Sequence, residues 1–286
     1  MRLSVVVVSR NEGEWLRRTV EGLEPTLPAD AETIVVDDGS TDGSAAFLTG
    51  TKARVIRTRG VGVARARNAG ARRAAGSALI FLDGHMVVRA GWWEPLLEAL
   101  ERPRAGAAAP AMADTNRPRT FGYGFTIPTP GLQPRWLPSA ASRPFHAPVL
   151  PGACLAMPRP VFEAVGGFDE GLRGRGGVDI ETSLRLWLLG YENWVVPEAR
   201  VWHAFRREAP YPMPPSDAIH NRLRLACVHL QGKRVARVME AQAGEAGIVE
   251  AVRKLCRSNV DLRRRDQFSR RVRNDDWFFR RFGIVW

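Results

Sequence analysis

The chain has 286 residues and a formal net charge of +12 at neutral pH. This length can bury one substantial core, and the three cysteines, Cys154, Cys227 and Cys256, are odd in number and widely spaced. Their pattern argues against a disulfide framework or a structural zinc site. No apolar run approaches the roughly 18 residues of a membrane span, and no signal-peptide pattern begins the chain, so we expect a cytoplasmic protein.

The positive charge favours a partner or substrate that carries phosphate groups. Clustered arginines bind nucleic acid through counterion release, but only three of the 42 basic residues are lysine. This skew resembles genomic codon bias more than a selected binding face, so we do not expect nucleic acid as the partner. An anionic diphosphate substrate or an anionic membrane surface would use the same charge.

Strands and helices alternate through the first third of the chain. Apolar runs at residues 3–8, 33–36, 54–57 and 78–82 predict buried strands, and helical patterns separate them. This alternation predicts an α/β fold with a mainly parallel sheet and right-handed crossovers. In such sheets the functional residues follow the carboxyl ends of the strands.

Polar or glycine residues follow each of these strands. They are Ser9, Asn11 and Glu12 after the first strand, Asp37 and Asp38 after the second, Gly62 and Arg65 after the third, and Asp83, Gly84 and His85 after the fourth. Gly60 and Gly62 lack the third glycine of a dinucleotide fingerprint and follow the wrong strand, which rejects that motif. A carboxylate at a strand end, such as that of Asp38, can accept the imide N–H of uracil, or can simply be a solvated turn residue.

Asp83-Gly84-His85 is the most informative of these segments. In an extended Asp-x-His the outer side chains lie on one side, so a carboxylate oxygen and an imidazole nitrogen can share a cation. Gly84 would allow the backbone to approach a ligand closely. The alternative is a strand followed by an ordinary turn, because Asp-Gly is a favoured turn pair.

Residues 103–150 are rich in proline and glycine and predict a region of loops, with one strand around 107–112. Its aromatic residues are either packing residues or a platform for a sugar or peptide acceptor. These residues are Phe121, Tyr123, Phe125 and Trp136.

Regular structure is predicted again from Gly152. Asp179 and Glu181 begin a helix with an apolar stripe; both are candidate catalytic acids, although acids in a first turn also simply complement the helix dipole. A later strand leads to His203 and Arg206. A lone histidine among aromatic residues is commonly a structural residue.

Residues 207–286 predict a basic helical extension, with His220 and His229 on helix surfaces. The aromatic segment at 275–279 lies between arginine pairs, which permits a tail that contacts a membrane surface. We favour instead a tail that packs over the site, with Trp277 closing on the bound ligand.

Four segments in this order resemble a known family. They are Val-Val-Val-Ser-Arg-Asn-Glu, Ile-Val-Val-Asp-Asp-Gly-Ser-Thr-Asp, Gly-x-x-Arg-Ala-Arg-Asn-Ala-Gly and Phe-Leu-Asp-Gly-His. The series resembles the nucleotide-sugar half of inverting family 2 glycosyltransferases with a GT-A fold, over residues 3–100 and again over 150–206. Asp83-x-His85, in place of the commoner Asp-x-Asp, resembles the variant in polypeptide N-acetylgalactosaminyltransferases, and so does His203 before a Phe-Arg pair.

The resemblance implies a metal-dependent transferase that moves a sugar from a UDP-sugar to the hydroxyl of a glycan, peptide or small-molecule acceptor. It implies that Asp83, His85 and His203 hold Mn2+ or Mg2+, and that Arg206 assists the departure of UDP. The implied donor-binding residues are Ser9, Asn11, Glu12, Asp37, Asp38, Gly62, Arg65, Asp83, Gly84, Gly152 and Trp277, with Asp38 reading uracil, Arg65 on the diphosphate or sugar and Gly152 against the sugar.

The resemblance divides at the catalytic helix. Asp179 resembles the catalytic base of family 2 enzymes, whereas the N-acetylgalactosaminyltransferases carry an amide there and a glutamate just before it; Val178 departs from both patterns. We expect Asp179 to act as a general base in an inverting reaction. The alternative is a retaining front-face reaction in which the departing phosphate takes the proton.

We predict a GT-A catalytic domain over residues 1–206 and a helical extension over 207–286. The domain would comprise a nucleotide-sugar-binding half (1–102), acceptor-side loops (103–150) and a catalytic half (151–206). A nucleotidyltransferase is one alternative, but it would need a triphosphate-binding glycine-rich loop that the segment 9–12 lacks. A non-catalytic protein that binds nucleic acid or a membrane surface through its basic tail is the other.

Overall fold

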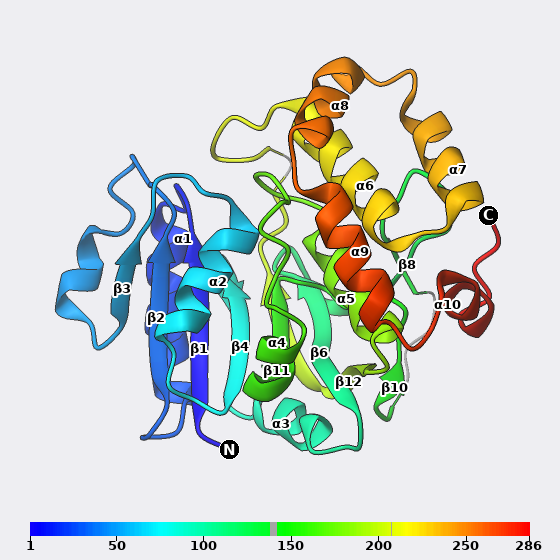
Figure 1. Ribbon diagram of the computed structural model, residues 1–286. Coiled ribbons are helices and arrows are strands. Elements are labelled where there is room, and N and C mark those ends of the chain that lie inside the picture. The colour runs from blue at the N-terminus through cyan, green and yellow to red at the C-terminus, as the bar shows by residue number, and fades with distance from the viewer. Residues whose placement is uncertain (138–141, 207) are drawn as a thin grey trace.

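The computed structural model describes residues 1–137, 142–206 and 208–286, and within them ten strands form one mixed sheet. Their order is β10-β12-β6-β11-β4-β1-β2-β3, with β5 paired to β12 and β7 to β6 (Figure 1). The strands are β1 (Leu3–Ser9), β2 (Glu32–Asp37), β3 (Arg54–Arg57), β4 (Ala78–Asp83), β5 (Met86–Val87), β6 (Ala105–Asp114), β7 (Arg117–Gly122), β10 (Phe145–His146), β11 (Cys154–Pro158) and β12 (Glu192–His203). A separate pair consists of β8 (Phe125–Thr126) and β9 (Arg135–Trp136).

The N-terminal half of the sheet is parallel, as the alternation of elements predicts. β1 pairs with β2 on one side and with β4 on the other, and β2 pairs with β3. In this register Ser9 lies opposite Asp37 and Val8 lies opposite Asp83. The carboxyl ends of these strands therefore meet at one edge, where the polar segments of the sequence follow.

Helices cover both faces of the sheet, which confirms the predicted α/β class (Figure 1). Val5 and Val7 pack with α1 (Glu14–Leu23) and α3 (Glu94–Leu100). Val6 and Val8 pack on the other face with α2 (Val63–Arg73), α4 (Arg159–Ala164) and α5 (Val178–Leu188). α2 lies so close to β1 that a Cβ on Gly70 would come within 2.3 Å of the Val6 side chain, so this helix position requires glycine.

The C-terminal half of the sheet holds two departures from the predicted elements. β6 is longer than the predicted strand and lies between β11 and β12 inside the sheet, so the segment 103–150 is less irregular than its composition predicts. The sequence predicts a strand at 194–196, before the segment that leads to His203. In the structure both belong to one strand, β12, which has a register shift between Val196 and Arg200.

Two short 3-10 turns also occur. η1 (Glu24–Thr26) directly follows α1, and η2 (Ala46–Gly50) lies between β2 and β3, where the helical pattern of the sequence predicts a longer helix.

The C-terminal extension is helical, as predicted, and it packs on α5. Its helices are α6 (Pro215–His229), α7 (Gly232–Gln242), α8 (Ile248–Cys256), α9 (Val260–Arg270) and α10 (Asp275–Arg281). Leu184 and Trp187 of α5 share a buried cluster with Leu225 of α6 and Phe278 of α10. Among the residues that the structure describes, no helix is long and apolar enough to cross a membrane.

Candidate active site

The polar strand ends line a cleft of about 210 Å³ at the carboxyl edge of the sheet. Nine residues that the sequence singles out contribute to its wall: Glu12, Asp38, Gly62, Asp83, His85, Gly152, Asp179, His203 and Arg206. They come from segments that are far apart in the sequence, and the sheet brings them together.

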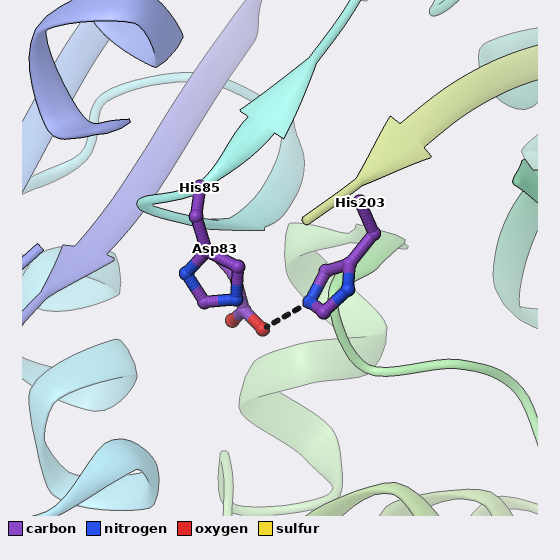
Figure 2. Close-up of side chains that lie close together, drawn as sticks. All are labelled: Asp83, His85 and His203. Atoms are coloured by element: carbon purple, nitrogen blue, oxygen red, sulfur yellow. Dashed lines mark ion pairs between the residues drawn. The ribbon is translucent and has the colours of Figure 1, made fainter. Parts of the chain in front are cut away.

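Asp83, His85 and His203 form a group whose potential ligand atoms all lie within 4.8 Å of one another. Asp83 ends β4, His85 follows in the turn, and His203 ends β12; Figure 2 shows the three side chains gathered between these two strand ends. β5 creates this proximity, because its pairing with β12 sets His203 opposite Met86. Nε2 of His203 lies 3.8 Å from Oδ2 of Asp83, so one carboxylate oxygen and two imidazole nitrogens could share a cation.

Glu12 orients His85 within this group. Its Oε2 lies 3.0 Å from Nδ1 of His85, which leaves the Nε2 side of the ring for a ligand. The same oxygen accepts a hydrogen bond from Nη2 of Arg206. Glu12 therefore ties the segment after β1 to the segments after β4 and β12.

Arg67 of α2 supports Asp83 from the other side of the cleft. Its Nη2 donates hydrogen bonds to Oδ1 of Asp83 at 2.9 Å and to the carbonyl oxygen of Gly152 at 2.7 Å. Burial would raise the pKa of Asp83, but His203, Arg67 and His85 outweigh it and hold that pKa well below its usual range. Asp83 is therefore ionised, as a cation ligand must be.

Asp179 projects from the first turn of α5 toward Gly152. A Cβ built on Gly152 would come within 2.3 Å of Oδ1 of Asp179, so only glycine leaves room for this carboxylate. Burial raises the pKa of Asp179, and the charge of Asp83 raises it further, while Arg67 opposes both. A carboxyl with a raised pKa is a stronger base once it is deprotonated.

Asp38 lines the cleft next to Gly62. Its Oδ1 accepts hydrogen bonds from Oγ1 of Thr58 at 2.6 Å and from the N–H of Val61 at 2.7 Å, and its Oδ2 accepts one from the N–H of Gly62 at 2.8 Å. A carboxylate oxygen has two lone-pair sites, so Oδ2 retains one acceptor site toward the cleft.

Four of the predicted donor-binding residues support the wall of the cleft without lining it. The backbone N–H of Asn11 donates to Oγ of Ser40, while its side chain accepts from the N–H of Thr41 and donates to the carbonyl oxygen of Pro210. Asp37 accepts from the N–H of Ser40. Gly84 donates to the carbonyl oxygen of Val8, and a Cβ there would crowd Glu12. Ser9 is buried in β1.

Arg65 and Glu181, which the sequence predicts as site residues, do not line the cleft, and helix geometry gives the reason. Residues two apart on a helix point about 200° away from each other. Arg67 therefore faces the cleft, while Arg65 donates instead to the carbonyl oxygen of Glu170. Likewise Asp179 faces the cleft, while Glu181 is fully buried between Arg185 and His229, with a 2.9 Å contact to each.

Trp277 does not lie over the cleft either. Its ring packs 6.0 Å from that of Trp187 on α5, and Arg273 stacks on it at 4.2 Å. The helix α10 begins after Asn274, whose side chain accepts from the N–H of Trp277. This helix is bound to the far end of α5, so the tail fills a core rather than closing on a sugar.

The two C-terminal histidines are also misplaced by the sequence prediction. His220 and His229 are buried rather than on helix surfaces. Nε2 of His229 contacts Oε1 of Glu181 at 2.9 Å, so this histidine joins α6 to α5 through a buried polar pair. Burial lowers the pKa of His229, which favours the neutral ring.

Arg67 and Tyr211 line the cleft although the sequence analysis did not single them out. The signal for Arg67 is its spacing: it stands three residues after Ala64 and four before Ala71, on the face of α2 that packs on the sheet. Tyr211 belongs to a proline-rich loop with no periodic pattern, so it had no comparable signal.

The fold and this site agree with the family to which the sequence can be assigned. The model of glycosyl transferase family 2 matches residues 4–166, which is more than half of the chain, and the chain belongs to this family. This membership argues against the nucleotidyltransferase alternative.

The sequence is also similar to those of individual known proteins. The chain is 33% identical over 256 residues to polypeptide N-acetylgalactosaminyltransferase 11 of Xenopus tropicalis, a match that covers 79% of this chain and 42% of the relative. It is 31% identical over 252 residues to the human polypeptide N-acetylgalactosaminyltransferase 15, covering 77% of this chain and 39% of that protein. The chain thus spans about 40% of the length of these curated relatives.

Solved structures confirm the predicted GT-A fold. A structure of GalNAc-T7 with UDP, GalNAc and Mn2+ superposes with a TM-score of 0.75 at 23% identity, over 99% of this chain and 56% of that one. A structure of TarS from S. aureus with UDP-GlcNAc gives a TM-score of 0.58 at 16% identity, over 89% of this chain and 70% of that one. The helical extension is included in the first superposition, because nearly the whole chain is covered.

Proposed function

We propose that the protein is a metal-dependent glycosyltransferase that moves a sugar from a UDP-sugar to an acceptor hydroxyl. The observation that carries this proposal is the group of Asp83, His85 and His203 inside the cleft of a family 2 chain. A carboxylate and two imidazoles suit Mn2+, and Mg2+ as a second choice. Such a cation, when bound, would neutralise charge on the leaving diphosphate.

The nucleotide end of the cleft supports uridine as the base. Asp38 keeps one acceptor site toward the cleft, which the imide N–H of uracil could use. Gly62 lines the same end without a side chain. UDP-N-acetylgalactosamine is the first donor to test, because the relatives' names specify this sugar; UDP-N-acetylglucosamine, UDP-galactose and UDP-glucose are the others.

Three residues around the sugar position would share the catalytic work. Asp179 would remove the proton from the acceptor hydroxyl, so that the reaction inverts the anomeric centre. Arg206 would stabilise charge on the departing UDP, and Glu12 would hold both Arg206 and His85 in place. Arg67 would keep Asp83 oriented and would offer its remaining N–H groups to the donor.

The acceptor is proposed from the relatives. Their names specify polypeptides, so a serine or threonine hydroxyl of a polypeptide is the first acceptor to test. A membrane contact through the tail has less support, since Phe278 and Phe279 are buried and the apolar face of α10 is already occupied. A reducing, cytoplasmic location is supported by the three cysteines, all of which are free.

A melting experiment tests the proposal. A ligand that binds only the native state raises the melting temperature, so UDP with Mn2+ should raise it, while UDP with EDTA or GDP with Mn2+ should not. Equal shifts with UDP in the presence and absence of EDTA would contradict metal dependence. No shift with any nucleotide and Mn2+ would reject the proposed function.

A further inference from the structure

A second hollow lies beside the cleft, and its wall includes residues of α2 and α4. We call it the arginine groove. It has a volume of about 1120 Å³ and runs between α2, the segment that precedes α5, and the C-terminal helices. The groove and the cleft share four wall residues, Arg10, Gly174, Arg175 and Tyr211, so the two hollows lie next to each other.

Each of the four acids in the groove wall already has a basic partner. Asp169 makes a bidentate pair with Arg224 at 2.7 and 2.8 Å, and Asp217 lies 2.7 Å from Lys254. The remaining two pairs are Glu170 with Arg72 at 3.2 Å and Glu163 with Arg159 at 3.5 Å. The charge of each of these carboxylates is therefore already balanced by one basic side chain.

The groove holds more arginines than these acids can neutralise. Within the described parts of the chain, five of its arginines make no ion pair with a carboxylate: Arg10, Arg65, Arg173, Arg175 and Arg257. A sixth, Arg263, reaches Asp266 only at 3.9 Å. Its Nε and Nη2 are buried without a hydrogen-bond partner among the described residues. The groove therefore has an excess of positive charge, which a ligand that carries carboxylate groups would balance.

We propose that the arginine groove binds an acidic segment of the polypeptide acceptor, next to the residue that is glycosylated. This inference rests on the proposed function, which supplies the polypeptide, and it adds the charge of the preferred substrate. A peptide extended along the groove could continue past the shared wall residues, so that its hydroxyl would lie near Asp179 in the cleft. Backbone and apolar wall residues such as Met213 and Pro214 would contact the peptide between its acids.

The shape and composition of the groove favour a peptide over other anions. Single-stranded nucleic acid is held mainly by open aromatic faces on which bases stack, but Arg10 covers the ring of Tyr211 at 4.5 Å and Phe162 is buried. A membrane surface is broad and would not enter a hollow. An acidic peptide is narrow and could lie along the groove with its carboxylates next to the unpaired arginines.

Fluorescence anisotropy with a labelled peptide tests the proposal. The probe has glutamates on both sides of one threonine, and the control peptide has glutamine in place of each glutamate. The test variant is Arg173→Glu with Arg257→Glu, since both side chains are exposed and line the groove but not the cleft. The matched variant is Arg237→Glu with Arg265→Glu, which makes the same charge change at exposed positions outside the groove.

The acidic peptide should bind the wild type more tightly than the glutamine peptide, and less tightly as salt is added. The groove variant should weaken this binding about tenfold or more, and the matched variant less than about twofold, because reversing two charges turns attraction into repulsion only inside the groove. Hydrolysis of the UDP-sugar donor should be unchanged in both variants. This combination would support the groove as an acceptor site.

Equal weakening by both variants, or equal binding of the two peptides, would overturn the proposal. Tighter binding of a single-stranded oligonucleotide or of phosphatidylserine vesicles, lost in the groove variant, would replace the peptide by another partner and overturn it as well. Intact donor hydrolysis without selective peptide binding would reject the groove alone. Peptide binding without any response to UDP and Mn2+ would reject the proposed function instead.

Discussion

At the scale of single residues, the direction in which a side chain leaves its helix decides whether it lines the cleft. Arg65 and Arg67 stand two positions apart on α2, and Asp179 and Glu181 stand two positions apart on α5. In each pair one side chain enters the cleft and the other lies on the opposite side of its helix. Family motifs identified the segment correctly, but the geometry of the helix decides which of its polar residues reaches a ligand.

The predicted cation ligands give the first test at this scale. Asp83→Asn, His85→Ala and His203→Ala should each abolish Mn2+-dependent UDP binding in calorimetry while circular dichroism stays that of the wild type, because the three act through one cation. His146→Ala is the control, since His146 on the edge strand β10 does not line the cleft. Wild-type Mn2+ dependence in His203→Ala would remove that residue from the site.

The second test concerns Asp179. Asp179→Asn keeps the size of the side chain but removes its basicity, so turnover should fall by about 10²–10⁴-fold with little change in donor affinity. Proton NMR of the fresh product should show an inverted anomeric centre. A retained centre together with near-normal turnover in Asp179→Asn would support the front-face alternative and dismiss the general base.

At the scale of elements, α5 joins the site to the rest of the protein. Its first turn supplies Asp179 to the cleft, while Glu181 and Arg185 on its opposite face form a buried pair that His229 of α6 completes. Removing one member of such a pair leaves an uncompensated buried charge. Glu181 is therefore a structural residue, and its substitution should change stability.

The third test follows from this pair. Glu181→Gln should lower the free energy of unfolding at neutral pH by about 3–5 kcal/mol, measured by urea unfolding, whereas Glu240→Gln on the exposed side of α7 should change it by less than about 0.5 kcal/mol. Burial would raise the pKa of Glu181, but Arg185 and His229 hold it far below its usual range. The stability that a depressed acid pKa supplies is present above the unfolded pKa, about 4.3, and is lost as the pH falls below it. The gap between wild type and Glu181→Gln should therefore shrink between about pH 5 and 3, and a constant gap would contradict this role.

The sequence predicted the parallel strands and the position of β6, but it did not predict the full length of β6 (Ala105–Asp114), for a physical reason. β1 and β4 are runs of Val, Leu, Ile and Phe that only a buried strand accommodates. β6 reads Ala-Gly-Ala-Ala-Ala-Pro-Ala-Met-Ala-Asp, a composition with low strand propensity. It is a strand because small side chains let neighbours approach closely: a Cβ on Gly106 would come within 2.7 Å of Tyr191. That requirement is tertiary and has no periodic signal.

At the scale of the whole molecule, the C-terminal helices complete the core of the catalytic part. Arg224 of α6 binds Asp169 in the turn before α5, and Phe278 and Phe279 of α10 are buried in the cluster that contains Trp187. Sequence analysis predicted the helices of this extension but not where they dock, because docking depends on contacts between residues more than fifty positions apart.

A pair of neighbouring substitutions in α10 separates packing from a role at the sugar. Phe278→Ala should lower the free energy of unfolding by about 3–5 kcal/mol, since this ring is fully buried. Trp277→Ala should leave the turnover and KM of donor hydrolysis within about twofold of the wild type at a temperature where it is folded. A large rise in donor KM for Trp277→Ala would restore the earlier hypothesis that this ring closes on the sugar.

Release of UDP from a panel of nucleotide sugars tests the central claim most directly. The protein is mixed with UDP-, GDP- and dTDP-sugars, with Mn2+ or with EDTA, and the free nucleotide is measured. We predict hydrolysis or transfer from a UDP-sugar with Mn2+, and loss of that activity in EDTA and in the Asp83→Asn variant. Activity that persists in EDTA, or that prefers a GDP- or dTDP-sugar, would contradict a metal-dependent UDP-sugar transferase.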